Sequence, residues 1–226
     1  MSQASSEGNR LKLGCLELAY IRPSADGSSE DAVLDALVEF TQHRKWIYPK
    51  QVHGKNIVEV NASTEPNMVA DGMICSDLSC GLAVFGGDCP GLVIKTNSDY
   101  FGIAHCGWRG TAAGIVNELV LALKKVCDSQ VRRWEAYVGP GISGDNYEVD
   151  EAVSEVFDWK DSSISWRKGN KIGLDLKSEI SVQLVDLGFL KPNIKVSKCC
   201  TYASAKWHSY RRDGKGQNQL LAVYRV

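Results

Sequence analysis

Runs of apolar residues with helical spacing alternate with short extended runs along this chain of 226 residues. The most regular helical pattern spans residues 111–127, where apolar side chains recur every three or four positions at Ile115, Val116, Leu119, Val120 and Leu123. Similar spacing predicts a helix over 32–44, another after residues 143–149, and a third within 174–188. Gly188 is the expected C-terminal stop of that third helix.

Short, strongly apolar runs predict strands between these helices. They lie at 11–23 (with a bulge at Gly14), in two pieces within 46–60, and at 73–77, 81–87, 91–95, 100–104, 132–142, 193–202 and 219–226. Strands and helices are interleaved throughout, which predicts a mixed fold of the α/β or α+β class. The simplest organisation is a disordered tail over 1–10 followed by one domain over 11–226.

Residues 91–95 and 100–104 are predicted to form a hairpin, because the intervening Thr-Asn-Ser-Asp has turn chemistry. If Lys95 pairs with Tyr100, position 89 falls opposite position 106. Cys89 and His105 then lie close together at the open end of the hairpin. A slip of one residue in this register would change the faces they occupy.

Composition narrows the possible partners. A net charge of −1 provides no overall field to attract nucleic acid or an anionic membrane. The polar N-terminus does not resemble a secretory signal, and no apolar run is long enough to span a bilayer. The eight cysteines are scattered and suggest no disulfide framework. We therefore expect a reduced, cytoplasmic protein that binds neither nucleic acid nor membrane.

His53, Cys89 and His105 are the first candidates for chemistry. Two imidazoles and a thiolate suit zinc, and also copper. Three protein ligands would leave a fourth position open, as catalytic zinc sites do. The residues alone leave two alternatives open. Cys89 could be a nucleophile activated by His105, or the three side chains could be ordinary core or hydrogen-bonded residues.

Three stretches offer groups that could bind a substrate or an anion. Arg109 lies in a Gly-Trp-Arg-Gly sequence at a helix start, where free N–H groups and a guanidinium suit phosphate. Arg211 and Arg212 lie in a basic segment over 209–219. Tyr147 and Glu148 are the polar candidates in the loop over 139–149. The alternative for each is a solvated surface residue.

A set of motifs, taken in order, resembles the laccase-domain family. These motifs are QVHG (51–54), ADGMICSD (70–77), GDCPGLVI (87–94), AHCGWRGTAAGIV (104–116), GPGISGDNYEV (139–149), LDL (174–176) and CTY with SYRRDG (200–214). Members of this family have been labelled multicopper polyphenol oxidases. The family also includes purine nucleoside phosphorylases and a bacterial peptidoglycan-editing factor. The resemblance covers roughly residues 45–226.

The resemblance implies a single-domain layered sandwich of mixed sheets flanked by helices, related to a group of cysteine hydrolases. It implies that His53, Cys89 and His105 bind a metal, usually zinc, and are catalytic. It also implies phosphorolysis of adenosine, inosine and methylthioadenosine, with adenosine deamination as a side activity. The expected partners are therefore a small nucleoside and phosphate.

The chain departs from the family pattern at two places. Asn146 stands where the family commonly has cysteine, and Lys215, Gly216 and Gln217 replace Thr-Gly-Arg. The multicopper label itself does not suit this chain. A blue-copper site alone uses two histidines and a cysteine, which leaves only His43 and His208 of four histidines for a further cluster. A single copper ion remains an alternative to zinc.

The implied reactions assign further roles to this chain's residues. Zinc deaminases use a carboxylate as general acid and base, and Asp88 and Glu148 are the candidates. Phosphorolysis needs phosphate held in line with the sugar carbon, a role that suits Arg109. The competing enzyme is a cysteine hydrolase or amidase that uses Cys89 and His105, for example in peptidoglycan editing. A non-catalytic partner protein is the third possibility.

Overall fold

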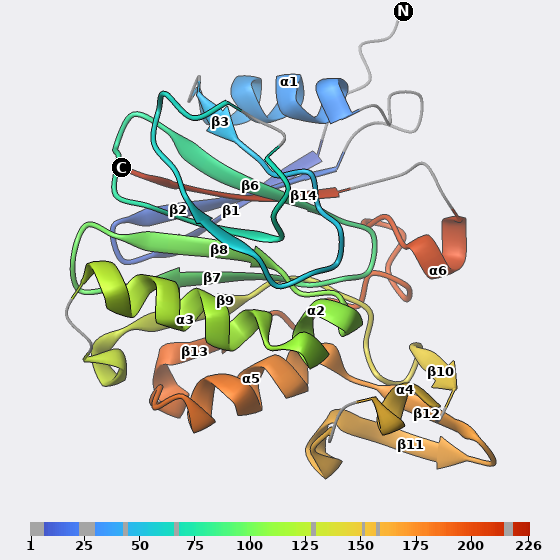
Figure 1. The fold of residues 1–226 in the computed structure, drawn as a ribbon. Coiled ribbons are helices and arrows are strands. Elements are labelled where there is room, and N and C mark those ends of the chain that lie inside the picture. Colours follow the sequence, from blue (N-terminus) through green and yellow to red (C-terminus); the bar gives the residue numbers. More distant parts are fainter. Residues whose placement is uncertain are drawn as a thin grey trace, which may run out of the picture.

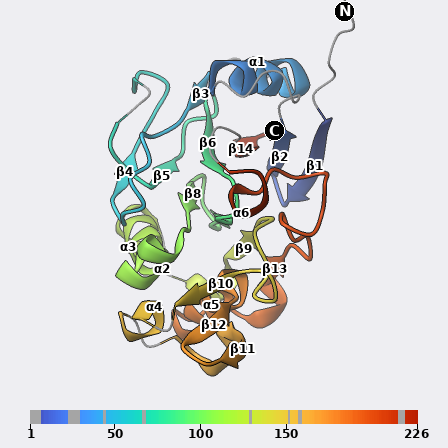
Figure 2. The ribbon, with the colours of Figure 1, turned by 90° about the vertical axis from the view of Figure 1, so that its right-hand side faces the viewer.

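The computed structural model describes residues 7–22, 30–42, 45–65, 68–127, 130–150, 152–156, 159–214 and 219–226. Two large sheets lie face to face, with helix α1 over one and helices α3 and α5 over the other, so that the molecule has four layers (Figure 1). A third, smaller sheet lies beside these layers (Figures 1 and 2). This arrangement confirms the predicted fold class of mixed sheets flanked by helices.

The first large sheet has five strands in the order β1-β2-β14-β6-β3. All neighbours in it are antiparallel except β3 and β6. The strands are β1 (Glu7–Leu13), β2 (Leu16–Arg22), β14 (Gln219–Arg225), β6 (Gly81–Gly86) and β3 (Trp46–Ile47). The C-terminal strand thus lies inside the sheet, which ties the end of the chain to the core.

The second large sheet has six strands in the order β13-β9-β7-β8-β5-β4. Its two outer pairs are parallel and its inner pairs antiparallel. The strands are β13 (Ile194–Val196), β9 (Glu135–Val138), β7 (Gly91–Lys95), β8 (Phe101–His105), β5 (Gly72–Cys75) and β4 (Ile57–Glu59). Strands β6 and β7 are consecutive in the chain but belong to different sheets.

The main core lies between the two sheets. Alternate residues of each strand face it, such as Leu18 and Tyr20 from β2 and Val93 from β7. The residues between them, such as Ile21 and Leu92, face the helices on the outer sides. Because both faces of each sheet are covered, the central strands are apolar almost without interruption.

The helices cover the outer faces of the two sheets. Helix α1 (Glu30–Thr41) packs against the five-stranded sheet, and α3 (Ile115–Val126) and α5 (Leu176–Asp186) pack against the six-stranded one. Asp175 caps the start of α5 by accepting hydrogen bonds from the backbone N–H groups of Lys177 and Ser178. Among the described residues, no helix has the length and apolarity needed to cross a membrane.

The small sheet was not predicted from the sequence. It has the order β10-β12-β11 and consists of β10 (Glu148–Asp150), β12 (Lys171–Leu174) and β11 (Ile164–Lys168), with helix α4 (Ala152–Glu155) between β10 and β11 in the chain. Its exposed residues are largely polar, which removes the apolar signal that marks the other strands. It positions the loop that carries Tyr147.

The N-terminal region differs from the prediction in two ways. The run 11–23 is two strands, not one strand with a bulge: β1 and β2 form a hairpin whose turn contains Gly14. Residues 7–10 belong to β1, so the tail predicted for 1–10 does not include them, and residues 1–6 lie outside the described residues. Helix α1 begins at Glu30 and ends at Thr41, whereas 32–44 was predicted.

The predicted hairpin exists, but its register is shifted by one residue. Lys95 pairs with Phe101 and Gly91 with His105. The cause is the turn, in which both the backbone N–H and the side-chain hydroxyl of Thr96 donate to the carbonyl of Tyr100. Tyr100 is therefore part of the turn, and His105 closes the last pair of the ladder.

The helix predicted over 111–127 is divided in two at Gly114. Helix α2 (Trp108–Ala113) ends there and α3 begins immediately after. Gly114 has a φ of 94°, in the left-handed region, and its N–H donates to the carbonyls of Gly110 and Thr111. The basic segment predicted as a loop contains a short helix, α6 (Tyr210–Asp213), and residues 215–218 and His43 lie outside the described residues.

The break at Gly114 gives a test of backbone strain without steric contact, because a Cβ at this position would meet nothing within 4 Å. Gly114→Ala should lower the free energy of unfolding by about 1–2 kcal/mol, the cost of the left-handed conformation. Gly114→Asn should cost less, because asparagine tolerates that conformation. Urea denaturation of the three proteins measures the difference, and equal stability of all three would contradict this origin of the break.

Candidate metal centre

The loop between β3 and β4 carries His53 and is fixed at two points. The side-chain amide of Gln51 pairs with both backbone groups of Phe85: it donates to the carbonyl at 2.8 Å and accepts from the N–H at 2.8 Å. Further along, the backbone N–H groups of Val52, His53 and Gly54 all donate to the carboxylate of Asp71, at 3.1, 2.9 and 2.7 Å. His53 has a φ of 59° and an exposed side chain.

Cys89 and His105 approach the same point from two other segments. Cys89 lies in the loop that crosses from β6 in one sheet to β7 in the other, and His105 is the last residue of β8. The backbone N–H of Cys106 donates to the carbonyl of Pro90 at 2.9 Å, which holds the two segments together just beyond the ladder. The shifted register therefore preserves the proximity of Cys89 and His105 that the sequence predicted.

The three candidate ligands converge. One nitrogen of His53, the sulfur of Cys89 and one nitrogen of His105 all lie within 4.8 Å of one another. The two imidazole rings are nearly perpendicular, with centroids 4.8 Å apart. Burial increases across the set: His53 is exposed, Cys89 is half-buried and His105 is buried. One side of the group is therefore open to solvent and the other faces the core.

Asp71 organises this group, although the sequence analysis did not single it out. It is fully buried, and its Oδ1 lies 3.0 Å from Nδ1 of His105. The same carboxylate accepts the three N–H groups of the His53 loop. By holding Nδ1, Asp71 leaves Nε2 of His105 as the nitrogen available to a metal, an arrangement common behind metal-binding histidines.

The ionisation of the group reflects these contacts. Burial raises the pKa of Cys89, but the charges and hydrogen bonds of His105 and His53 outweigh it and lower that pKa to about 6. Burial lowers the pKa of His105, but the Cys89 thiolate and the hydrogen bond to Asp71 raise it to about 9. Burial raises the pKa of Asp71, but the hydrogen bonds from His105 and from the His53 loop outweigh burial and hold that pKa below its usual value. A thiolate, the form that binds metal, is thus favoured.

Gly107 makes room for an occupant of this group. A Cβ at this position would lie 2.9 Å from Cδ2 of His53, 3.2 Å from Sγ of Cys89 and 3.5 Å from Cε1 of His105. Any side chain here would press on His53 and Cys89 and would contact His105. The donor set, the buried carboxylate behind His105 and the absence of a side chain at Gly107 together fit a zinc or copper ion.

Asp88, predicted as a catalytic acid or base, is occupied elsewhere. Its carboxylate accepts hydrogen bonds from the Thr201 hydroxyl (2.5 Å), the Ser209 hydroxyl (3.1 Å) and the backbone N–H of Arg211 (2.8 Å). It is buried. These contacts fasten the C-terminal segment to the Cys89 loop, and this geometry does not present the carboxylate to a substrate. Glu148 is exposed and forms an ion pair with Lys171.

Arg211 and Arg212, predicted together, have opposite surroundings. Arg212 donates through Nη1 and Nη2 to the carbonyls of Thr201, Tyr202, Ser204 and Trp207 and forms an ion pair with Asp213. Its donors are therefore engaged in holding the segment over 201–213. Arg211 instead extends over the ring of Tyr147, 5.3 Å from its centroid, and donates to the carbonyl of Glu148.

Arg109 lies two residues beyond Gly107, and Arg211 lies over the ring of Tyr147. Burial and then the negative charge of Cys89 raise the pKa of Tyr147, while the charges of Arg211 and Arg109 act in the opposite direction. The charges of Cys89, Arg211 and Arg109 therefore all act on the hydroxyl of Tyr147. Arg109 is exposed and lies over the Trp108 ring, 4.5 Å from its centroid. Asn146, the residue that departs from the family pattern, donates instead to Ser143 and Cys200.

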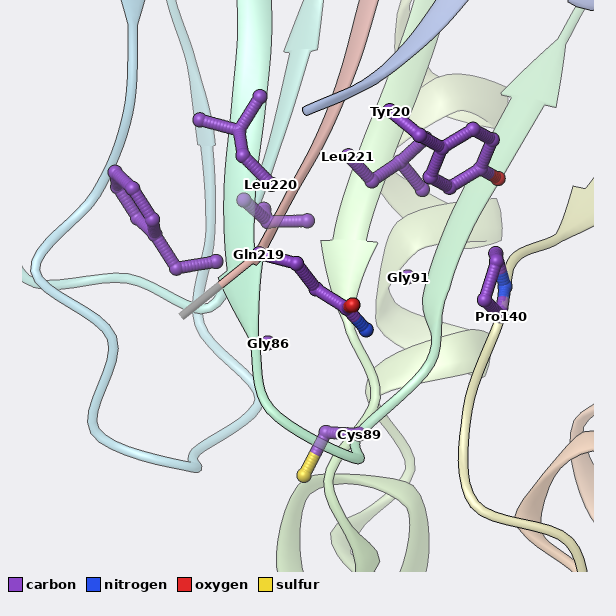
Figure 3. A pocket seen from close by; sticks show the side chains of 10 residues that line it. Tyr20, Gly86, Cys89, Gly91, Pro140, Gln219, Leu220 and Leu221 are labelled. Atoms are coloured by element: carbon purple, nitrogen blue, oxygen red, sulfur yellow. The ribbon is translucent and has the colours of Figure 1, made fainter. Parts of the chain in front are cut away.

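A small cavity lies behind Cys89 (Figure 3). Tyr20, Pro140, Gln219 and Cys89 are among the residues that line it, and its volume is about 20 Å³. That volume admits about one water molecule. A larger molecule must therefore approach the three ligands from the side on which His53 is exposed.

Comparison with known proteins identifies the family to which the chain belongs. The family model described as multi-copper polyphenol oxidoreductase laccase matches residues 28–224. The chain belongs to this laccase family. A purine nucleoside phosphorylase of Staphylococcus epidermidis is 32% identical over 195 residues, covering 80% of this chain and 72% of that protein. The purine nucleoside phosphorylase YlmD of Geobacillus stearothermophilus is 30% identical, covering 79% and 71%.

Solved structures of the laccase family share the fold. YfiH of Bacillus licheniformis superposes with a TM-score of 0.85 at 22% identity and covers 93% of both chains. The crystal structure of YlmD gives the same TM-score and identity and covers 93% of this chain. Despite the multi-copper name, the described residues contain one group of three or more His, Cys, Asp or Glu side chains placed to hold a metal, the group formed by His53, Cys89 and His105.

Asp71 gives a test of the metal centre that does not depend on activity. Asp71→Asn keeps the shape but removes the negative charge and places an amide N–H₂ against backbone N–H groups. We expect zinc affinity to fall 10–100-fold, as for other residues behind metal-binding histidines. Competition with a chromophoric chelator measures the affinity. Asp77→Asn is the matched control, because Asp77 accepts backbone N–H groups in a turn outside the metal centre. Equal affinities in the two variants would contradict the role of Asp71.

Proposed function

We propose that this protein is a zinc-dependent purine nucleoside phosphorylase that acts on adenosine, inosine and methylthioadenosine. The observation that carries the proposal is the convergence of His53, Cys89 and His105 within 4.8 Å, in a chain whose curated relatives include purine nucleoside phosphorylases at 30–32% identity. These three residues are the proposed metal ligands and the centre of the active site. Zinc is the proposed metal, and copper is the alternative.

When bound, the metal would supply a Lewis acid beside the substrate. The chain's own residues have separate tasks around it. Asp71 holds the Nδ1 proton of His105 and fixes the His53 loop, so that both imidazoles keep their orientation. The exposed side of His53 admits the nucleoside, and Gly107 leaves the space between the ligands free of side chains.

Arg109 and Arg211 are the proposed phosphate ligands. Phosphorolysis requires a phosphate oxygen to attack C1′ of the sugar as the base leaves with a proton. In the described structure the Arg109 guanidinium lies over the Trp108 ring, so its N–H groups can form two hydrogen bonds to a phosphate. Tyr147, whose pKa is raised, keeps its proton and can donate a hydrogen bond to the bound substrate.

Deamination of adenosine is proposed as the minor activity. The carboxylates predicted to serve it, Asp88 and Glu148, are held by the C-terminal segment and by Lys171. Neither is placed as a general acid and base for attack on the purine ring. Phosphorolysis depends instead on phosphate positioning, for which the exposed guanidinium of Arg109 is available. We therefore expect base and ribose phosphate to be the main products.

The central test is an assay on the three nucleosides with and without phosphate, in metal-loaded protein, with products separated by chromatography. Phosphate-dependent release of the free base, lost in Cys89→Ala, is the expected result. Inosine formed from adenosine without phosphate would shift the assignment to deamination. No turnover of any nucleoside by metal-loaded protein would refute the proposal.

Substitution of individual arginines distinguishes a role in phosphate binding from a role in stabilising the fold. Arg109→Ala should raise the KM for phosphate about tenfold, the effect of losing roughly 1.4 kcal/mol of a charge-assisted contact, and change the nucleoside KM much less. Steady-state kinetics with each substrate varied in turn measure both constants.

Arg132→Ala is the matched control, because Arg132 is an exposed arginine in a short 3₁₀ turn outside the site. Arg212→Ala should act differently, by lowering stability, since it removes hydrogen bonds to four backbone carbonyls. If Arg109→Ala raised the KM for phosphate and the KM for nucleoside equally, the assignment of Arg109 to phosphate binding would be contradicted.

A cysteine hydrolase or amidase is the second candidate, and one observation favours it. Cys89, His105 and Asp71 follow one another as a nucleophile, a base and a carboxylate that orients the base. The two functions differ in their sensitivity to reagents. Chelation should abolish phosphorolysis and spare a cysteine hydrolase, whereas alkylation of the metal-free protein should inactivate either enzyme. Amidase activity that survives chelation would favour this second candidate.

A further inference from the structure

A pair of cysteines lies outside the metal centre. Cys75 ends strand β5 of the six-stranded sheet, and Cys80 immediately precedes strand β6 of the five-stranded sheet. Both side chains are fully buried in the core between the sheets. Their sulfur atoms are 3.5 Å apart. No role in metal or substrate binding has been given to either residue.

The turn between the two cysteines holds them in position. The side chain of Asp77 accepts from the backbone N–H of Ser79 at 2.8 Å and from that of Ala62 at 2.9 Å. The backbone N–H of Asp77 in turn donates to the sulfur of Cys75 at 3.2 Å. Residues 78 and 79 of this turn are exposed. The pair therefore lies just beneath a surface turn, and a small oxidant needs only a local opening of that turn to reach it.

We propose that Cys75 and Cys80 form a site of reversible oxidation that closes to a disulfide in response to a hydroperoxide. A disulfide bond is about 2.05 Å long, so the sulfurs, now 3.5 Å apart, must approach by roughly 1.5 Å. Rotation of the two side chains in a short turn can supply that movement. The oxidant is of the hydroperoxide class because two buried thiols exclude a bulky disulfide reagent.

The chemistry proceeds in two balanced steps. The Cys75 thiolate attacks the terminal peroxide oxygen and the O–O bond breaks, which gives a sulfenic acid and a hydroxide or alkoxide. That leaving group takes up the proton released when the Cys75 thiol ionised and departs as water or an alcohol. The Cys80 thiol then attacks the sulfenic sulfur, and its proton and the sulfenic hydroxyl leave as water as the S–S bond forms. Cys75 is the expected first thiol, because hydrogen bonds from Cys80 and from the Asp77 N–H lower its pKa, whereas the pKa of Cys80 is raised.

The pair is separated from the metal centre by the length of one strand, along β5 on one side and along β6 on the other. Asp71 immediately precedes β5 and Cys75 ends it, while Cys80 precedes β6 and Cys89 follows it. The disulfide would thus tie β5 and β6 together at the ends remote from the metal ligands. Oxidation at this pair is therefore expected to proceed without displacement of a metal held by Cys89.

Peptide mapping tests the proposal directly. Metal-loaded protein is treated with a few equivalents of hydrogen peroxide, its free thiols are blocked under denaturing conditions, and it is cleaved on the N-terminal side of aspartate. Asp71, Asp77 and Asp88 place Cys75, Cys80 and Cys89 on three separate peptides, 71–76, 77–87 and 88–98. We expect peptides 71–76 and 77–87 to be joined, with a mass about 2 Da below the sum of the reduced pair. A dithiol reductant should separate them.

Three outcomes would overturn the proposal. The first is recovery of peptides 71–76 and 77–87 unlinked and with blocked thiols, under conditions in which an exposed thiol such as Cys15 or Cys199 has been oxidised. The second is sulfinic acid on Cys75 without a cross-link. The third is a link to peptide 88–98. Cys80→Ser should abolish the cross-link and leave a sulfenic acid at Cys75 that dimedone traps, and Cys80→Ala serves if the hydroxyl impairs folding.

Cys127→Ser is the matched control, because Cys127 is a half-buried thiol in another part of the molecule and should leave the cross-link intact. A second readout is stability. The unfolding midpoint of the oxidised wild type in urea should lie above that of the reduced protein, because the disulfide restricts the unfolded chain. The same treatment of Cys80→Ala should give no such shift, and an equal shift in that variant would contradict the assignment.

Discussion

The buried carboxylate of Asp71 is the contact on which the site depends. It accepts three backbone N–H groups from one loop and faces the inner nitrogen of His105 from another segment. A buried charge is costly unless it is fully hydrogen-bonded, and here every bond it makes holds a residue that positions a proposed metal ligand. The electrostatic requirement of one side chain thus determines the positions of His53 and His105 together.

The ligands themselves could be predicted from the sequence, but their support could not. His53, Cys89 and His105 stand out because the chain has only four histidines and because imidazole and thiol groups have specific chemistry. Asp71 is one of five aspartates next to a glycine, and only the folded chain shows its burial. The hairpin register was wrong by one residue because it depends on a hydrogen bond from the Thr96 side chain to Tyr100, which residue types alone do not reveal.

The fold was predictable where burial leaves a periodic or strongly apolar pattern, as in α3 and the central strands. It was not predictable in the sheet formed by β10, β11 and β12, where β12 is mostly buried but β10 and β11 consist of exposed and half-buried residues without a strong apolar pattern. Arg211 and Arg212 show the same limit for function. Two adjacent arginines have identical chemistry in the sequence, yet one holds four backbone carbonyls and the other lies over Tyr147.

The crossing of the chain between β6 and β7 has a mechanical consequence. His53 and Cys89 both lie in segments that run from the five-stranded sheet to the six-stranded one, from β3 to β4 and from β6 to β7. An ion bound by these two residues and His105 would join the two crossings to each other. A shift of one sheet against the other would strain both crossings, so the affinity for the ion would depend on how well the shared core is packed, and loss of a methyl group far from the ligands would lower it.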